Sequence, residues 1–526
     1  MIYINLPALK NWLRKLIILL TKQFFMQRIQ KIGFVVGLIS FLIILIFFNP
    51  DPENPNVGKV AAVAVLMAIW WITEALPMAA TSLVPLVFFP LLGVLSGSEI
   101  SGSYINSVIF LFIGGFMLAI AMENWGLHKR IALKIISIFG GTANSILFGF
   151  MFSATFLSMW ISNTATAVMM LPIALAVITK IENEFGKEET KNFSKSVLLG
   201  IAYSCSIGGI ATLIGTPPNL ALVRIHKIAF PSAPQISFGD WMLLAFPITV
   251  LLLILTAILL SKIFFKSNKS IGIGKDFIKN EYNSLGSFSF PEKVIAVIFS
   301  ITSFLWIFRT DLNLGFIKIT GWSSFFSVPD FIDDGTIAIT MAFLLFLFPS
   351  KNEKQKTILA ANVFEQIPWG IILLFGGGFA LATAFSSSGL SQFIGNNLRG
   401  LSHIPVFLLV LIICTIINFL TELTSNTATT QMILPILASV SVAIGINPLL
   451  LMIAATLSAS MAFMMPVGTP PNTIVFASKR LKISDMAKTG FALNLISVIV
   501  IALLVYFIGS IIFDLNTFPE WAKIPQ

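Results

Sequence analysis

Two short motifs place amide and hydroxyl side chains inside long apolar stretches, and each motif occurs twice. SNTAT spans 162–166 and 425–429, and GTPPN spans 215–219 and 468–472. The oxygens of Asn, Ser and Thr side chains, with the backbone carbonyls that a helix break leaves free, suit a hard cation such as Na⁺. Amide and hydroxyl donors and the N-terminus of a helix suit a carboxylate or another oxyanion. The motifs therefore predict a site where a bound cation balances a bound anion.

The second copy of each motif lies at a regular distance from the first. GGFMLAIAMENWGL at 114–127 matches GGFALATAFSSSGL at 377–390, and SNTAT is repeated at the same offset of 263 residues. GTPPN is repeated at an offset of 253 residues, so the second half lacks ten residues between its two motifs. An internal duplication explains this pattern.

The composition indicates a membrane protein that crosses the bilayer many times. Hydrophobic residues make up 56% of the chain, charged residues only 11%, and 49 residues are Phe. The apolar stretches are long enough to cross a hydrocarbon core about 30 Å thick. The net charge of +10 does not indicate nucleic-acid binding, because six of the basic residues fall within 1–31, before the first acidic residue, Asp51. That pattern is typical of a cytoplasmic segment beside a first membrane span.

The elements that must position the motifs are broken helices. Pro217, Pro218, Pro470 and Pro471 remove amide donors and interrupt a helix, which exposes carbonyls and creates new helix ends. Polar backbone of this kind persists inside a membrane where it lines a cavity. Matching interruptions in two repeats indicate a secondary transporter whose site lies between the repeats. The run 423–478 contains no charged residue, so the second pair of motifs supplies no fixed charge to that site.

An intramembrane enzyme and a channel are less consistent with these motifs. The sequence contains no Asp pair, metal-binding His motif or phosphate-binding loop that would support hydrolysis within the membrane or ATP-driven transport. Duplicated, interrupted helices fit alternating access better than an open pore. The two cysteines, Cys205 and Cys414, each lie in an apolar run and are expected to be buried thiols.

The paired SNT motifs, each followed by TPPN, together with WWITEALP at 70–77, resemble those of the divalent anion/sodium symporter family. Members of that family transport C4-dicarboxylates, citrate or sulfate. The resemblance covers 33–513 and implies an all-α polytopic fold of about eleven transmembrane helices, arranged as two inverted repeats with two re-entrant hairpins and broken helices. It also implies a scaffold domain, an elevator-type transport domain and a homodimer.

The resemblance assigns the site residue by residue. The first sodium site falls on Ser158, Ser162, Asn163 and the backbone at Gly215. The second falls on Thr421, Ser425, Asn426 and the backbone at Gly468. Six side chains are implied as substrate contacts: Asn163, Thr164, Thr216, Asn426, Thr427 and Thr469.

The function implied by the resemblance is sodium-driven uptake of a di- or tricarboxylate by an elevator mechanism, with a C4-dicarboxylate such as succinate or malate favoured. Sodium is then the co-transported ion, and the partners are a small anion and the lipid bilayer. A sodium-independent dicarboxylate exchanger and a sulfate/sodium symporter remain alternatives, because the short motifs do not separate these modes.

The chain is expected to divide into six parts. They are a basic amphipathic segment (1–31), a first span (32–57), repeat 1 (58–265), a polar inter-repeat loop (266–290), repeat 2 (291–513) and a C-terminal tail (514–526). In the cell membrane, a cytoplasmic N-terminus and an odd number of spans would place the tail outside.

Several other residues attract attention by their type and position. Glu74 abuts Pro77 at the end of a span and is interpreted as one half of a structural pair. Glu422, three residues before Ser425, either tunes the second cation site or caps the hairpin. Four glycines are expected to allow close helix packing inside the hairpins: Gly114, Gly115, Gly377 and Gly378.

Overall fold

The protein is a bundle of helices, most of them apolar. The computed structural model describes residues 28–139, 141–267, 275–313, 318–352 and 355–523. Within these residues the strands form two short antiparallel pairs: β1 Leu312–Asn313 with β2 Lys318–Ile319, and β3 Pro349–Asn352 with β4 Gln355–Thr357. The predicted all-α class is confirmed.

Eight helical stretches within the described residues are long and apolar enough to cross a membrane. They are α2 Arg28–Phe47, α3 Asn56–Thr73, α6 Gly97–Tyr104 with α7 Ser107–Asn124, α10 Asn163–Phe185, α13 Phe238–Ile258 with η1 Leu259–Phe264, α15 Phe290–Ile307, α18 Trp369–Ser387 and α24 Ile483–Phe513. Five shorter apolar stretches are α4 Met78–Thr81 with α5 Val84–Leu91, α9 Ala143–Ser158, α16 Asp334–Leu347, α20 Val406–Thr421 and α22 Pro448–Ala459. Short apolar helices are what re-entrant hairpins and broken spans require.

Each SNT motif lies at the tip of a helical hairpin. In the first repeat α9 leads into α10, and the hydroxyl of Ser162 caps α10 by accepting the amide of Ala165 at 3.1 Å. In the second repeat α20 leads into α21 Asn426–Ala443, where the hydroxyl of Ser425 accepts the amide of Ala428 at 3.5 Å. Serine is favoured at the position before a helix because its oxygen satisfies one of the free amides there. Both motifs therefore begin a helix whose remaining N-terminal amides are free to bind other groups.

Each hairpin is followed by a helix that breaks at GTPPN. α11 Lys187–Gly209 and α12 Pro217–Ala229 flank the first break, and α22 and α23 Pro470–Phe476 flank the second. Two consecutive prolines begin both α12 and α23, where the first helical turn does not need their missing amide donors. The four prolines therefore restart each helix as well as interrupt it.

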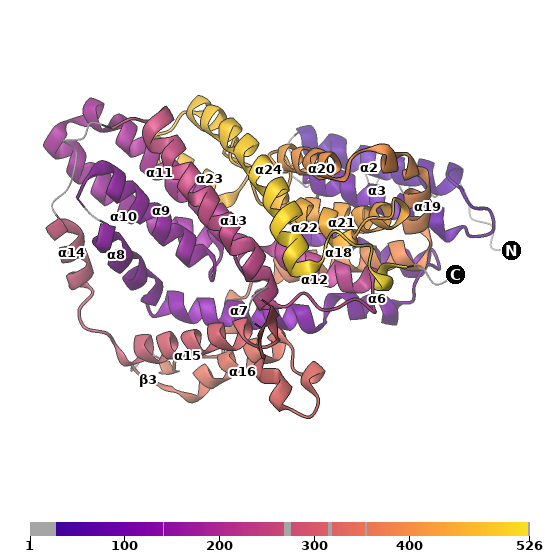
Figure 1. Cartoon of the computed structure of the whole chain (residues 1–526), viewed down its shortest axis with the longest axis horizontal. Coiled ribbons are helices and arrows are strands. Elements are labelled where there is room, and N and C mark those ends of the chain that lie inside the picture. The colour runs from indigo at the N-terminus through magenta and orange to yellow at the C-terminus, as the bar shows by residue number, and fades with distance from the viewer. Residues whose placement is uncertain (1–27, 140, 268–274, 314–317, 353–354, 524–526) are drawn as a thin grey trace, which may run out of the picture.

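The second part of each broken helix packs against the other repeat. α12 contacts α21 and α22, whereas α23 contacts α10 and α11 (Figure 1). In Figure 1, α9, α10, α11 and α23 gather on one side of the molecule, and α12, α18, α21 and α22 gather on the other. The two breaks thus link the hairpin of one repeat to the hairpin of the other.

The duplicated glycines lie on α7 and α18, outside the hairpins, so their predicted location is wrong. They do allow close packing. A Cβ on Gly114 would lie 2.6 Å from the backbone of Ala338 in α16, and a Cβ on Gly377 would lie 2.6 Å from the carbonyl oxygen of Ser82. The error arose because a repeated sequence does not distinguish a hairpin helix from the span that precedes it.

The remaining elements connect these helices. α8 Leu127–Phe139 joins α7 to the first hairpin, α19 Leu390–Asn397 joins α18 to the second, and α14 Lys275–Ser284 lies in the predicted inter-repeat loop. Short helical turns complete the list: α17 Val363–Gln366, η2 Trp322–Phe325, η3 Pro329–Phe331, η4 Arg399–His403 and η5 Glu520–Ala522. The predicted amphipathic segment falls outside the described residues except for 28–31, which belong to α2.

A buried ion pair fastens α8 to the first turn of α15, and further hydrogen bonds reach the segment before it. Nε of Arg130 lies 2.6 Å from Oε1 of Glu292, and the same guanidinium donates to the carbonyls of Leu285, Gly286 and Ser287. Both charged side chains are buried. Removing one partner of such a pair leaves an uncompensated charge, which typically costs about 3–5 kcal/mol.

We expect Arg130→Met to lower the melting temperature of the detergent-solubilised protein, because Glu292 would lose its partner. Lys191→Met is the matched control, since Lys191 pairs with Glu188 on the surface at 3.1 Å and such pairs contribute at most about 1 kcal/mol. Thermal unfolding monitored by intrinsic tryptophan fluorescence measures both variants. Equal melting temperatures would show that the buried pair does not stabilise the fold.

Candidate functional site

The residues predicted for the first cation site form a cluster of oxygen atoms at the tip of the first hairpin. The hydroxyl oxygen of Ser158 lies 2.5 Å from Oδ1 of Asn163 and 2.7 Å from the carbonyl oxygen of Cys205 in α11. A hydroxyl carries one proton, so it donates to one of these oxygens at a time. Ser158 is fully buried, and Asn163 is partly buried. The cluster therefore offers several neutral oxygens beside a helix N-terminus.

The second cluster has the same geometry at equivalent positions. Oγ1 of Thr421 lies 2.7 Å from Oδ1 of Asn426 and 2.8 Å from the carbonyl oxygen of Ala459 in α22. Thr421 is fully buried, as Ser158 is. The duplication has thus kept one hydroxyl, one amide oxygen and one helix carbonyl together in each repeat.

Gly215 and Gly468 lie beside these clusters, in the loops that separate the two parts of each broken helix. A Cβ on Gly215 would lie 3.0 Å from the carbonyl oxygen of Ser158, and a Cβ on Gly468 would lie 3.1 Å from Oε2 of Glu422. A side chain larger than hydrogen would therefore press on the hairpin tip at Ser158 in the first repeat and on the carboxylate of Glu422 in the second.

Comparison with known proteins places this arrangement in a family. The sequence pattern of the sodium:sulfate symporter transmembrane region matches residues 23–515. The chain belongs to the sodium:sulfate symporter family. The sodium-dependent dicarboxylate transporter SdcS of Staphylococcus saprophyticus is 45% identical to this chain over 486 residues, which are 91% of each chain. SdcS of Staphylococcus aureus strain MRSA252 is 44% identical over 493 residues, or 93% of this chain and 92% of that one.

Two solved structures are similar to this protein in fold. MtrF of Neisseria gonorrhoeae has a TM-score of 0.54 at 12% identity and covers 88% of this chain and 96% of its own. The YdaH transporter of Alcanivorax borkumensis has a TM-score of 0.54 at 12% identity, over 87% of this chain and 100% of its own. The predicted family is confirmed, and the names of the relatives confirm a transporter rather than an enzyme.

The Asn that ends each GTPPN motif holds the loop between the two parts of each broken helix, here called the break loop, a role that the sequence analysis missed. Nδ2 of Asn219 donates to the carbonyl of Thr212 at 2.7 Å, and Nδ2 of Asn472 donates to the carbonyl of Met465 at 3.0 Å. Both Asn side chains are fully buried. They satisfy carbonyls that the helix breaks release, as buried carbonyls require. The repetition of this Asn was the signal that could have identified it.

The hydroxyl of Thr212, a neutral side chain, fixes the first break loop. Oγ1 of Thr212 donates to the carbonyl of Met159 at 2.5 Å and accepts the amide of Gly215 at 3.1 Å. Thr212 is fully buried. Its hydroxyl thus ties the loop that carries Gly215 to the tip of the first hairpin.

A carboxylate replaces that hydroxyl in the second repeat. Glu422 accepts the backbone amides of Phe463, Met464 and Met465 at 2.6, 2.8 and 3.0 Å. Glu422 ends α20, the first helix of this hairpin, through its backbone amide, whereas Ser425 caps α21 with its side chain. The cap interpretation therefore holds for the backbone of Glu422, and its carboxylate caps neither helix of the hairpin. The partners of Glu422 lie in the break loop that precedes Gly468.

The predicted substrate contacts differ in exposure. Thr164 is exposed, whereas its counterpart Thr427 is only 8% exposed. Thr216 and Thr469 are buried immediately before α12 and α23, and Oγ1 of Thr469 has no hydrogen-bond partner among the described residues. Within that part of the chain, hydrogen bonds join each SNT motif to its own repeat, and none joins the two motifs directly.

Glu74 terminates α3 rather than forming the expected pair. Its backbone has a φ of 48°, in the left-handed region, and its amide donates to the carbonyl of Trp70. This is a common way to end a helix. No hydrogen bond or ion pair reaches its carboxylate from the residues that the structure describes, so the predicted pair is not found among them.

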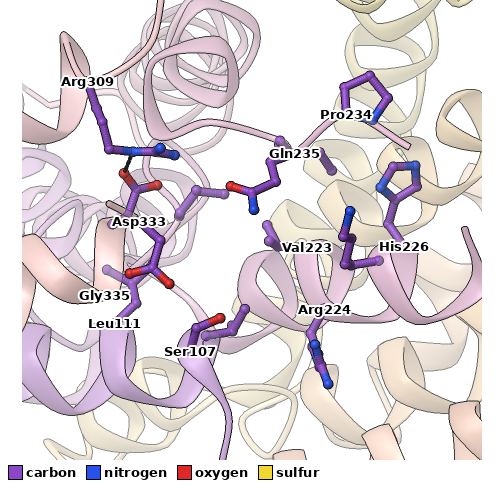
Figure 2. A pocket seen from close by; sticks show the side chains of 15 residues that line it. Ser107, Leu111, Val223, Arg224, His226, Pro234, Gln235, Arg309, Asp333 and Gly335 are labelled. Atoms are coloured by element: carbon purple, nitrogen blue, oxygen red, sulfur yellow. Dashed lines mark hydrogen bonds and ion pairs between the residues drawn. The ribbon is translucent and has the colours of Figure 1, made fainter. Parts of the chain in front are cut away.

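A pocket lies away from the SNT motifs, between the starts of α7 and α16 and the end of α12 (Figure 2). Its lining includes Ser107, Val223 and Gln235, and Arg309 pairs with Asp334 at 2.6 Å along one side. None of the predicted sodium or substrate residues lines it. This pocket is therefore not assigned to the transport site.

We expect Gly209→Ala to reduce the rate of substrate uptake by about tenfold or more, because small displacements in a binding site have large effects. The new Cβ would lie 2.6 Å from Oδ1 of Asn163 and would displace that side chain. Gly370→Ala is the matched control, since its nearest neighbour would be Cβ of Ala79 at 3.8 Å. Uptake of radiolabelled substrate, normalised to the amount of protein, is the measurement. Similar rates in the two variants would contradict a role for Asn163 in this geometry.

Proposed function

We propose that this symporter couples sodium entry to the uptake of a di- or tricarboxylate, with a C4-dicarboxylate such as succinate or malate favoured. The observation that carries the proposal is the pair of equivalent hydroxyl–amide clusters at the hairpin tips. The two SdcS relatives are named sodium-dependent dicarboxylate transporters, which supports both the ion and the class of cargo.

Each cluster supplies neutral oxygens for one sodium ion. The first site would use Ser158, Ser162, Asn163 and the backbone at Gly215, and the second would use Thr421, Ser425, Asn426 and the backbone at Gly468. In each cluster a hydroxyl already lies 2.5–2.8 Å from an amide oxygen and a helix carbonyl. A cation bound there would meet these oxygens without a change of fold, and hard cations prefer such ligands.

The substrate carboxylates would bind at helix N-termini. Asn163 with Thr164 and Asn426 with Thr427 begin α10 and α21, and free amides there attract anions. Thr216 and Thr469 precede α12 and α23. The unpartnered hydroxyl of Thr469 is a further donor or acceptor. Neither cluster hydrogen-bonds to Lys or Arg within the described residues, so bound sodium would supply the positive charge.

We infer that transport moves the two hairpins relative to a scaffold that includes α7 and α18. α21 packs on α18, and a Cβ on Gly378 would collide with the Gln431 side chain. At the equivalent positions of the first repeat, Gly115 faces Ile214 and Val168 is 55% exposed. The two repeats share one sequence pattern but pack differently. Such a difference is expected when a transporter built from repeats is in one of its two end states. In the other state the first hairpin would pack on α7, which is the elevator motion.

Uptake into proteoliposomes tests the proposal. Labelled succinate, malate, citrate and sulfate are each supplied with an inward gradient of sodium or of choline. We expect dicarboxylate to accumulate only with sodium. Asn163→Ala and Asn426→Ala should each reduce uptake, because each removes an oxygen from a different cation site and a donor from the shared substrate site. Equal uptake in choline would favour a sodium-independent exchanger, and preferential uptake of sulfate would favour a sulfate symporter.

We further propose that the protein is a homodimer in the cell membrane with a cytoplasmic N-terminus and an external C-terminus. The basic residues near the N-terminus support that orientation, and the family resemblance supports the dimer. The mass of the detergent-purified protein, measured by light scattering, tests the dimer. A mass of one protomer would contradict it.

A thiol introduced at Lys523 tests the orientation. Lys523 is exposed in the C-terminal tail, and both native cysteines are buried, so background labelling should be low. We expect a membrane-impermeant maleimide to label Lys523→Cys in right-side-out membrane vesicles. Labelling that requires permeabilisation would reverse the orientation.

A further inference from the structure

Glu422 differs from the other buried carboxylates of the described residues because none of those residues provides it with a cationic partner. Four acidic side chains are buried within the described residues, and Glu182, Glu292 and Asp334 each form an ion pair with an Arg. Glu422 is 3% exposed, and no Lys, Arg or His of the described residues lies within ion-pair distance of it. A buried charge without a counter-charge is costly. A cation that binds nearby would reduce that cost.

The hydrogen bonds of Glu422 fit an ionised carboxylate. Besides the three amides of the break loop, Oε1 accepts Nδ2 of Asn494 at 2.8 Å. All four partners are donors, whereas a protonated carboxyl would itself need an acceptor. Amide dipoles spread the negative charge, but they do not supply the positive charge that would neutralise it.

This carboxylate lies next to the second cation cluster. Glu422 directly follows Thr421, whose hydroxyl contacts Oδ1 of Asn426. Oε2 of Glu422 lies 3.1 Å from the position of a Cβ on Gly468, the residue assigned as the backbone ligand. The same carboxylate holds the loop that leads to Gly468. Its charge and its hydrogen bonds therefore both act on the second site.

The first repeat has no corresponding charge. The positions equivalent to Glu422 and Met465 are Met159 and Thr212, and there the loop is tied by a neutral hydroxyl that donates to the carbonyl of Met159 at 2.5 Å. The two break loops thus have similar anchoring but different electrostatics.

We propose that Glu422 makes the two sodium sites inequivalent. As a positioning residue, it fixes the loop that carries Gly468, and its charge makes the second site bind sodium more tightly than the first. The second site therefore fills before the first as the sodium concentration rises. The inference rests on the proposed sodium-coupled transport and adds to it an order of loading that the two similar motifs alone do not provide.

Variants that remove the charge test this inference. Glu422→Gln removes the charge alone, and the double variant Glu422→Met with Met465→Thr rebuilds the neutral arrangement of the first repeat. We expect each to raise the sodium concentration for half-maximal uptake about tenfold, or about 1.4 kcal/mol, while most of the maximal rate remains at saturating sodium. Glu422→Asp keeps the charge and should stay close to the wild type.

Glu182→Gln is the matched control, because it makes the same chemical change at a buried carboxylate that pairs with Arg480. Its sodium dependence should match that of the wild type. The inference would be overturned if the sodium concentration for half-maximal uptake were unchanged in both variants that remove the charge, or if only their maximal rate fell. Sodium-dependent uptake by the wild type would still support the proposed function in that case. Sodium-independent uptake by the wild type would instead refute the proposed function.

Thermal unfolding in detergent provides a second measurement for any variant that does not transport. Sodium should raise the melting temperature of the wild type more than that of the double variant, because the tighter site has lost its charge. Equal stabilisation by sodium in the two proteins would also overturn the inference.

Discussion

Backbone groups inside a membrane must find partners within the protein, and the two breaks at GTPPN release several of them at once. The carbonyls of the first break loop bind Asn219, and those of the second bind Asn472. The amides of the second loop bind Glu422. The Asn contacts close each loop on itself, whereas Thr212 in the first repeat and Glu422 in the second hold the loops that carry Gly215 and Gly468 against the hairpin tips. The groups that satisfy the broken backbone therefore also build the candidate cation sites.

The breaks also determine how the two repeats are joined. Because α12 packs on α21 and α23 packs on α10, each restarted helix connects its own loop to the hairpin of the other repeat. A displacement of one hairpin would be passed to the other through these contacts. The different surroundings of Gly115 and Gly378 show that the two repeats do not occupy equivalent positions against α7 and α18.

The sequence was sufficient to predict the features that depend on composition and spacing. The apolar runs predicted a helical membrane protein, and the duplicated SNT and TPPN motifs predicted the family. The family resemblance also assigned Ser158 and Thr421 to the same clusters as the Asn that each contacts, which stands five residues further along the chain. Contacts over so short a distance in sequence form within one hairpin tip.

Features that depend on partners far apart along the chain could not be predicted from the sequence. Glu422 contacts an amide 41 positions further along the chain, across a helix break, and an Asn 72 positions away. The run that begins at Leu423 holds no charged residue, whereas the carboxylate of the preceding residue, Glu422, accepts amides of the loop that leads to Gly468. The position of Glu74 beside a Pro suggested a pair, whereas its backbone ends a helix.

The central claim is that a neutral set of ligands binds the anion together with sodium. Calorimetric titration of the detergent-purified protein with succinate, across a series of sodium concentrations at constant ionic strength, tests this claim most directly. Binding at one of two linked sites typically raises the affinity of the other by about 5- to 150-fold. We therefore expect the succinate affinity to increase by a factor within this range as sodium replaces choline. A succinate affinity that is the same with and without sodium would contradict the account.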